Sequence, residues 1–141
     1  MNILYLSYDG LTDPLGQSQV LPYIIGLTKE GYTFTIISFE KKDRYFLQKE
    51  FIEKICFENN IKWVPLFYTK RPPILSTIFD LWKMKRLSLK LHKQESFKLI
   101  HCRSYISSIV GLYFKQKHFI PFLFDMRGFG QTKELMAIYV I

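Results

Sequence analysis

Short apolar runs alternate along the chain with segments whose apolar residues recur at helical spacing. The expected strands are Asn2–Tyr8, Thr33–Phe39, Ile61–Leu66, Phe97–Cys102 and Ile120–Asp125. The expected helices are Ser18–Glu30, Asp43–Glu58, Ile74–Gln94 and Tyr105–Lys117. Strands that alternate with helices in this way favour a parallel sheet covered on both faces. The pattern therefore predicts an α/β fold: one three-layer domain built on a doubly wound parallel sheet.

Four single residues refine the boundaries of these elements. Gly31 is expected to end the first helix in a left-handed conformation, and Asp43 is expected to cap the start of the second helix. Pro22 fits the first turn of its helix and would otherwise kink it. Pro65 lacks a backbone N–H, so its strand is expected at an edge of the sheet or to end there.

Composition narrows the class of protein. The 141 residues are 48% apolar and 23% charged, which fits one globular domain and excludes wholesale disorder. The two cysteines, Cys56 and Cys102, are too few for a disulfide framework or a four-ligand zinc site, and no other metal site is expected. The start of the chain, MNILYLSYDG, is interpreted as a strand and not a signal peptide, and no apolar stretch has the length of a membrane span. We therefore expect a cytoplasmic protein that meets a membrane only from its surface.

The formal charge of +8 is concentrated between Lys70 and Arg103, a segment that contains nine basic and two acidic residues. Four of these basic residues follow a 3-4-3 spacing on the third helix: Lys83, Arg86, Lys90 and Lys93. A basic stripe beside apolar residues suits a helix that lies on an anionic membrane surface, and equally a crossover helix with a solvated basic face. Nucleic-acid binding is the weaker interpretation, because the aromatic residues belong to the expected strands and helix cores.

Candidate chemistry lies just after the strands, since open parallel sheets bind ligands outside the carboxyl ends of their strands. The first strand is followed by DGLTDPLGQSQ, in which the amides of Gly16, Gln17 and Ser18 lead into a helix. Backbone N–H groups at a helix start attract phosphates and other anions. The alternative is a purely structural turn, because the loop matches neither G-x-G-x-x-G nor a P-loop.

Two further strand ends carry charged side chains. His101 and Arg103 lie at or just after the end of the fourth strand, and Asp125 and Arg127 lie at or just after the end of the fifth. Together they predict a convergent polar set, in which arginine can bind phosphate bidentately and histidine or aspartate can act as a general base. Alternatively, Asp125 pairs with an arginine to end its strand, and His101 is a hydrogen-bonded histidine of the core.

Three segments together resemble the N-terminal domain of GT-B glycosyltransferases of the retaining family-four group: NILYLSYDGLTDPLGQSQVLPYIIGLTKEGYTFTIISFEK, LIHCRSY and FLFDMRGFG. The resemblance implies a Rossmann-like domain over residues 1–130, with residues 131–141 a divergent and truncated tail. It also implies a glycosyltransferase that moves a hexosyl group from a nucleotide sugar to a lipid-linked or polysaccharide acceptor, in cell-envelope polysaccharide biosynthesis. No metal and no cofactor beyond the donor substrate are implied.

The resemblance assigns roles to individual residues. Gly16, Gln17 and Ser18 would face the donor diphosphate, Asp13 would contact the acceptor, and His101 and Ser104 would bind substrate. Arg103, which stands where many relatives carry a histidine, would act in catalysis with Asp125 and Arg127. Relatives also bind the inner membrane face through a basic helix of this domain.

The family uses a second domain, in which an E-x7-E pair contacts the donor. Glu50 and Glu58 have that spacing here, but they lie on the second helix of the first domain, and we interpret them as solvent-facing. The chain is thus expected to be inactive alone and to need a separate donor-binding domain as a partner. The alternative is a non-catalytic module that binds an anionic membrane or such a partner.

Overall fold

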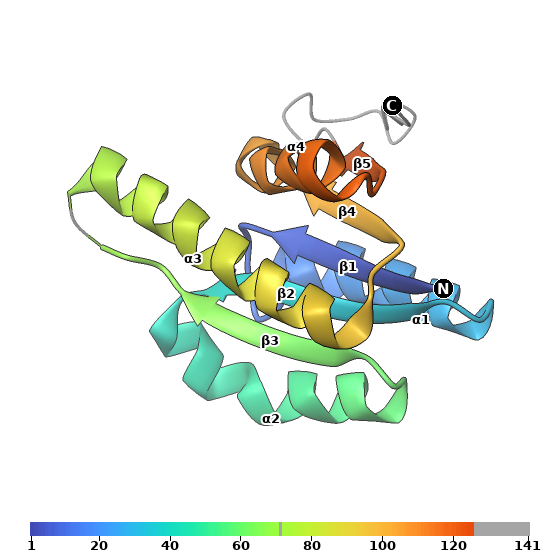
Figure 1. Ribbon diagram of the computed structural model, residues 1–141. Helices are drawn as coiled ribbons and strands as arrows, with labels where there is room; N and C mark the ends of the chain where they lie inside the picture. The colour runs from blue at the N-terminus through green and yellow to red at the C-terminus, as the bar shows by residue number, and fades with distance from the viewer. Residues whose placement is uncertain (71, 126–141) are drawn as a thin grey trace.

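The computed structural model describes residues 1–70 and 72–125, which form a five-stranded parallel sheet flanked by helices (Figure 1). The strands are β1 (Asn2–Ser7), β2 (Thr33–Glu40), β3 (Lys62–Phe67), β4 (Leu99–Arg103) and β5 (Phe122–Asp125). The helical elements are η1 (Gly16–Val20), α1 (Leu21–Lys29), α2 (Lys42–Glu58), α3 (Pro73–Glu95) and α4 (Tyr105–His118). The predicted α/β class and the order of elements are confirmed. The expected domain boundary at residue 130 and the tail lie outside the described residues.

The sheet has the strand order β3-β2-β1-β4-β5, with β1 in its centre. The chain builds β2 and β3 on one side of β1 and then crosses to place β4 and β5 on the other side. The carboxyl ends of β1 and β4 therefore flank the point where the strand order reverses, which is the usual ligand-binding position in open α/β sheets. β3 is an edge strand, as predicted from Pro65.

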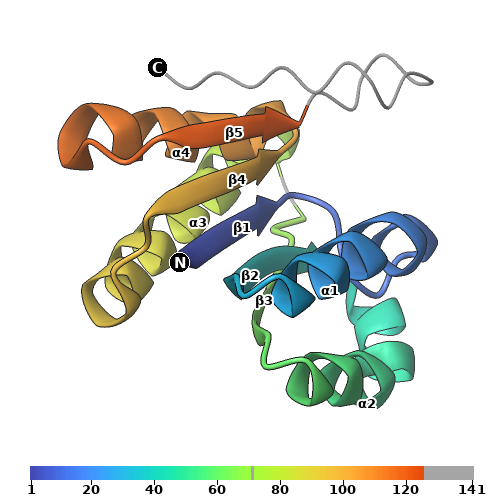
Figure 2. The ribbon, with the colours of Figure 1, turned by 90° about the vertical axis from the view of Figure 1, so that its right-hand side faces the viewer.

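Each face of the sheet has its own hydrophobic core. Along β1, Leu4 and Leu6 pack in the cluster that includes residues of α3 and α4, whereas Ile3 and Tyr5 pack in the cluster with α1 and α2. This alternation follows from the two-residue period of a strand. Figures 1 and 2 show the resulting three layers, with α3 and α4 on one side of the sheet and α1 and α2 on the other.

The first helical segment begins two residues earlier than predicted, and the prediction for Gly31 is confirmed. The helix after β1 begins with a π-helical turn, η1, in which the backbone N–H of Leu21 bonds to the carbonyl of Gly16. Pro22 is the second residue of α1, directly after η1, so its missing N–H falls within a continuous helical segment and not at a free helix start. Gly31 has a φ of 98°, the left-handed conformation predicted for it.

The N-cap predicted for α2 is wrong. Lys41 occupies that position without a side-chain hydrogen bond, and Asp43 lies in the first turn of the helix. The carboxylate of Asp43 still interacts favourably there with the N-terminal end of the helix dipole.

Candidate functional site

The carboxyl ends of β1, β4 and β5 lie side by side. In the register of the sheet Ser7 pairs with Arg103, and Arg103 pairs with Asp125. The loop that follows β1 begins at the same edge, so the segments expected to meet there do meet. Arg127 lies outside the described residues.

Arg103 is the charged residue that ends β4, and its side chain is buried. Only 3% of its surface is exposed, and its Nε lies 3.5 Å from Oδ2 of Asp9. That distance exceeds the roughly 2.7–2.9 Å of a charge-assisted hydrogen bond, and Nε has no hydrogen-bond partner. The side chain of Asp9 is more than half exposed. The Asp9 carboxylate therefore neutralises part of the positive charge of Arg103. The Nε–H group of Arg103 remains without an acceptor.

His101 lies two residues earlier on the same strand and is also 3% exposed. Its ring stacks on Tyr5, with centroids 4.5 Å apart, and meets the edge of the Tyr23 ring at 5.8 Å. The expected burial is confirmed, whereas the ring nitrogen Nε2 has no hydrogen-bond partner. A buried polar atom without a hydrogen-bond partner destabilises a fold by about 1–3 kcal/mol. Arg103 and His101 therefore each lower the stability of this fold.

Tyr23 and Asp125 complete this cluster. The pKa of Tyr23 is raised from its ordinary value, first by burial and then by the negative charge of Asp125. Tyr23 projects from α1, so one helix and three strands contribute to the edge.

Ser104 connects β4 to α4 in an unusual conformation. Its φ is 94°, a region that favours glycine, and its hydroxyl oxygen lies 3.4 Å from that of Ser107. Its backbone N–H donates to the carbonyl of Asp125. Strained backbone of this kind is frequent at functional sites, where the surrounding structure enforces it.

The β1–α1 loop is held by Glu40 from the end of β2. This carboxylate is 1% exposed and accepts hydrogen bonds from the backbone N–H groups of Leu11 and Thr12, at 2.8 and 3.1 Å. Gly16 packs so closely that a Cβ there would lie 2.3 Å from the carbonyl oxygen of Gly10. An internal carboxylate thus already occupies two loop amides that would otherwise attract an anion.

The loop residues predicted to bind donor and acceptor have the following places. The backbone N–H of Gln17 donates to the carbonyl of Asp13 at 3.1 Å, so it is used within the loop. Ser18 is exposed, and the carboxylate of Asp13 lies 3.4 Å from Nε of Arg44. Gly16 is buried.

Sequence reasoning missed the importance of three residues at this edge: Asp9, Tyr23 and Glu40. Asp9 and Glu40 could have been found by the strand-end rule, because each lies at or near the carboxyl end of a buried strand. Tyr23 carries no such signal, since its distance from His101 depends on how α1 packs.

Lys83 differs from the other three cations of the predicted basic stripe because its ammonium group contacts protein groups. Its ammonium group lies 3.2 Å from the buried carboxylate of Asp80 and donates to the carbonyl of Phe67 at 2.7 Å. Arg86, Lys90 and Lys93 are exposed. Lys83 therefore fixes the β3–α3 connection, and the other three cations form the solvated part of the stripe.

The first half of α3 carries an exposed apolar surface, which we call the α3 apolar end. It consists of Ile74, Leu75, Ile78, Phe79 and Trp82, each between 49% and 77% exposed. The guanidinium of Arg86 lies 5.2 Å from the Trp82 ring. Figure 1 shows these first turns of α3 projecting beyond the sheet.

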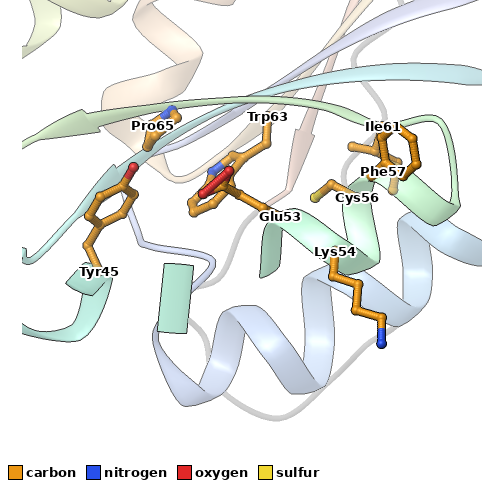
Figure 3. A pocket seen from close by; sticks show the side chains of 8 residues that line it. All are labelled: Tyr45, Glu53, Lys54, Cys56, Phe57, Ile61, Trp63 and Pro65. Atoms are coloured by element: carbon orange, nitrogen blue, oxygen red, sulfur yellow. The ribbon is translucent and has the colours of Figure 1, made fainter. Parts of the chain in front are cut away.

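A separate pocket of about 510 Å³ lies between α2 and the edge strand β3 (Figure 3). It is lined by Tyr45, Glu53, Lys54, Cys56, Phe57, Ile61, Trp63 and Pro65. In the described part of the chain, the buried side-chain atoms without partners belong to His101 and Arg103, not to this pocket. We therefore place the candidate functional site at the carboxyl ends of β1 and β4, and not in this pocket.

The described residues contain no candidate metal cluster and no candidate membrane span. No group of three or more His, Cys, Asp or Glu side chains is arranged to hold a metal ion there. Among the helices of residues 1–70 and 72–125, none is both long and apolar enough to cross a bilayer.

Comparisons with known proteins show the fold. No family model matches the sequence, and no curated protein matches it. MurG of Acinetobacter baumannii has a similar structure, with a TM-score of 0.54 and 15% identity over 87% of this chain and 34% of MurG. The spinosyn rhamnosyltransferase SpnG, complexed with thymidine diphosphate, has a TM-score of 0.55 and 9% identity over 91% of this chain and 36% of SpnG.

A deacetylase from the teicoplanin biosynthesis pathway also shares the fold, with a TM-score of 0.62 and 7% identity over 100% of this chain and 73% of the deacetylase. At these identities the likeness concerns the fold alone. The chain is a Rossmann-like α/β domain whose structural neighbours include GT-B glycosyltransferases, and it spans about a third of the length of MurG or SpnG.

Proposed function

We propose that the chain is the acceptor-side domain of a GT-B glycosyltransferase of the retaining family-four group. The observation that carries this proposal is the meeting of Arg103, Asp9 and Asp125 beside the β1–β4 reversal point. The proposed reaction moves a sugar from a nucleotide-sugar donor to a lipid-linked or polysaccharide acceptor, in cell-envelope polysaccharide biosynthesis.

In this reaction Arg103, Asp125 and Arg127 would act at the reacting sugar. A guanidinium that is shielded from water stabilises the negative charge of a departing diphosphate more strongly than one in solvent. The loop from Gly16 to Ser18 would face the donor, Asp13 would contact the acceptor, and His101 and Ser104 would bind substrate. The nucleotide sugar is the donor substrate, and the proposal involves no metal or other cofactor.

Transfer also requires that donor and acceptor be held together in reacting geometry. The chain spans about a third of the length of MurG and of SpnG. We therefore propose that transfer needs a donor-binding domain in addition to these 141 residues, and that the 141 residues do not transfer sugar alone.

The test compares the chain alone with the chain fused to the donor-binding domain of a GT-B glycosyltransferase. Radiolabelled UDP- and TDP-sugars are supplied with lipid-linked and polysaccharide acceptor fractions. We expect label to enter the acceptor with the fusion only, and Arg103→Gln to lower the rate about 10²–10³-fold. Lys54→Gln, which removes an exposed cation on α2, is the matched control and should not change the rate.

Either half of this proposal can fail separately. Transfer by the unfused chain would contradict the need for a donor-binding domain. A folded fusion that transfers no label from any donor would contradict the transferase assignment.

A second candidate function is binding to an anionic membrane surface, and the α3 apolar end favours it. Five exposed apolar side chains lie on the same helix as exposed Arg86, Lys90 and Lys93. Apolar residues that enter the interface, next to cations that meet lipid phosphates, are the two elements of interfacial binding. The chain would then be a peripheral protein on the cytoplasmic face of the membrane, with or without a catalytic role.

A further inference from the structure

Within the described part of the chain, the buried side-chain nitrogen and oxygen atoms that lack hydrogen-bond partners are Nε2 of His101 and Nε of Arg103. Both belong to β4 and stand two residues apart. Alternate residues of a strand point to the same face, so both side chains leave the sheet on the side of α1. Buried polar groups in proteins are nearly always satisfied, and two exceptions on one strand end require an explanation.

Arg103 carries a permanent positive charge that Asp9 neutralises only loosely. The Nε of Arg103 and Oδ2 of Asp9 are 3.5 Å apart, whereas the Asp9 side chain is 56% exposed and can turn into solvent. Arginine presents planar N–H donors that match the oxygens of a phosphate bidentately. An oxyanion that displaced Asp9 would find a guanidinium already withdrawn from water.

His101 adds a second donor to the same face. Its ring is held by stacking on Tyr5 at 4.5 Å, so its orientation does not depend on a hydrogen bond at Nε2. A neutral imidazole donates from one nitrogen and accepts at the other. Beside an oxyanion, the tautomer with a proton on Nε2 is the one that donates.

We propose that Arg103 and His101 form a phosphate-binding site in which the ligand takes the place of the Asp9 carboxylate. The identity of the phosphate, though not its binding, rests on the proposed glycosyltransferase function. Two sources share this chemistry: the diphosphate of the nucleotide-sugar donor and the phosphate of a lipid-linked acceptor.

The experiment titrates the folded 141-residue chain with inorganic phosphate at constant ionic strength, with chloride as the reference anion. NMR follows the Nε–Hε signal of Arg103 and the ring nitrogens of His101. We expect saturable shifts of both signals with phosphate and no saturable shift with chloride. A linear, unsaturated drift of both signals would overturn the proposal.

Two variants act in opposite directions on this site. Asp9→Asn removes the competing carboxylate from an exposed position, so it should tighten phosphate binding at least threefold. Arg103→Gln should weaken binding more than tenfold, while Lys54→Gln, an exposed charge change on α2, should leave it unchanged. Equal affinity in Asp9→Asn and the unsubstituted chain would also overturn the proposal, and this test stands even if Arg103→Gln does not fold.

Two further ligands distinguish the sources. Tighter binding of UDP or TDP than of inorganic phosphate would support the site and identify the donor diphosphate as its ligand. Tighter binding of geranyl phosphate, a soluble isoprenyl monoester, than of inorganic phosphate would support the site and identify the phosphate of a lipid-linked acceptor as its ligand. Saturable phosphate binding without sugar transfer by the fusion protein would support the phosphate-binding site and reject the transferase function. Sugar transfer by the fusion protein without saturable phosphate binding would support the transferase function and reject the phosphate-binding site.

Discussion

At the scale of single residues, Glu40 shows how one buried carboxylate organises the loop beside the candidate site. It accepts hydrogen bonds from two backbone N–H groups and from the hydroxyl groups of Thr12 and Ser38. These donors belong to the β1–α1 loop and to β2, so Glu40 joins two parts of the chain about 30 residues apart in sequence. The loop conformation therefore depends on a side chain outside the loop.

Replacing Glu40 by alanine is predicted to lower the free energy of unfolding by about 3–5 kcal/mol. The variant leaves several buried donors without an acceptor, and each lost hydrogen bond to a charged group is worth roughly 1.5–3 kcal/mol, not fully additively. Urea unfolding measures the change. Glu50→Ala, an exposed substitution on α2, should stay within about 0.5 kcal/mol. Equal stability of the two variants would show that Glu40 does not hold the loop.

Residue identity alone predicted part of this site. Arg103, His101 and Asp125 were found because charged residues end apolar strands, and Glu50 and Glu58 were correctly interpreted as exposed. The pairing of Arg103 with Asp9 was not predicted, since the sequence does not state that β1 and β4 are neighbours.

At the scale of elements, α3 has two different halves. Its second half packs against the sheet, with Met84 and Leu91 in the core, whereas the α3 apolar end has no such cover among the described residues. The periodicity of the sequence predicted the helix nearly to its ends but could not separate these halves. The difference arises because α3 is longer than the face of the sheet it crosses, as Figure 1 shows.

Substitution of Leu75 and Ile78 by glutamate is predicted to weaken capture by anionic vesicles. Two charges would replace apolar groups that enter the interface, and both would repel anionic lipid. Co-sedimentation with anionic and neutral vesicles, at low and high salt, measures binding. Phe57→Glu is the matched control, because Phe57 is 84% exposed on α2, away from α3.

The cations of the same helix should contribute the salt-sensitive part of this binding. Arg86→Gln and Lys90→Gln should each lower affinity about fivefold at low salt, in line with roughly 1 kcal/mol per cation near an anionic surface. Capture that is unchanged by all these substitutions would reject the membrane-binding function of α3.

At the scale of the whole molecule, two cores stabilise the sheet, and each contains one cysteine. Cys56 packs on the α1–α2 side and Cys102 on the α3–α4 side. Burial raises the pKa of each thiol to about 12, from 9.0. The same effect, together with the Asp80 carboxylate, raises the pKa of the Tyr8 phenol to about 12.

These shifts predict that the protein loses stability as pH rises above 9. The folded state keeps both thiols protonated up to about pH 12, whereas an unfolded chain releases those protons near pH 9. The stabilisation is complete below pH 9, and between pH 9 and 10 each thiol should remove about 1 kcal/mol from the free energy of unfolding. Urea unfolding at pH 7, 8, 9 and 10 measures this slope.

The control is the double variant Cys56→Ala and Cys102→Ala. It is less stable at neutral pH, because buried volume is lost, but its free energy of unfolding should change much less between pH 9 and 10. An unsubstituted chain whose stability stays constant over that range would contradict the predicted burial of the thiols.

The sequence by itself determined the elements, their order and the α/β class, because apolar periodicity and turn residues act over a few neighbouring positions. It also placed the chemistry at strand ends, since parallel strands share a carboxyl edge. Only the tertiary structure decided that β1 is central, that Asp9 faces Arg103, that Glu40 closes the loop and that Lys83 leaves the basic stripe for Asp80. Those contacts join residues whose distance in space depends on the order of the strands and the packing of the helices, and local patterns do not encode that distance.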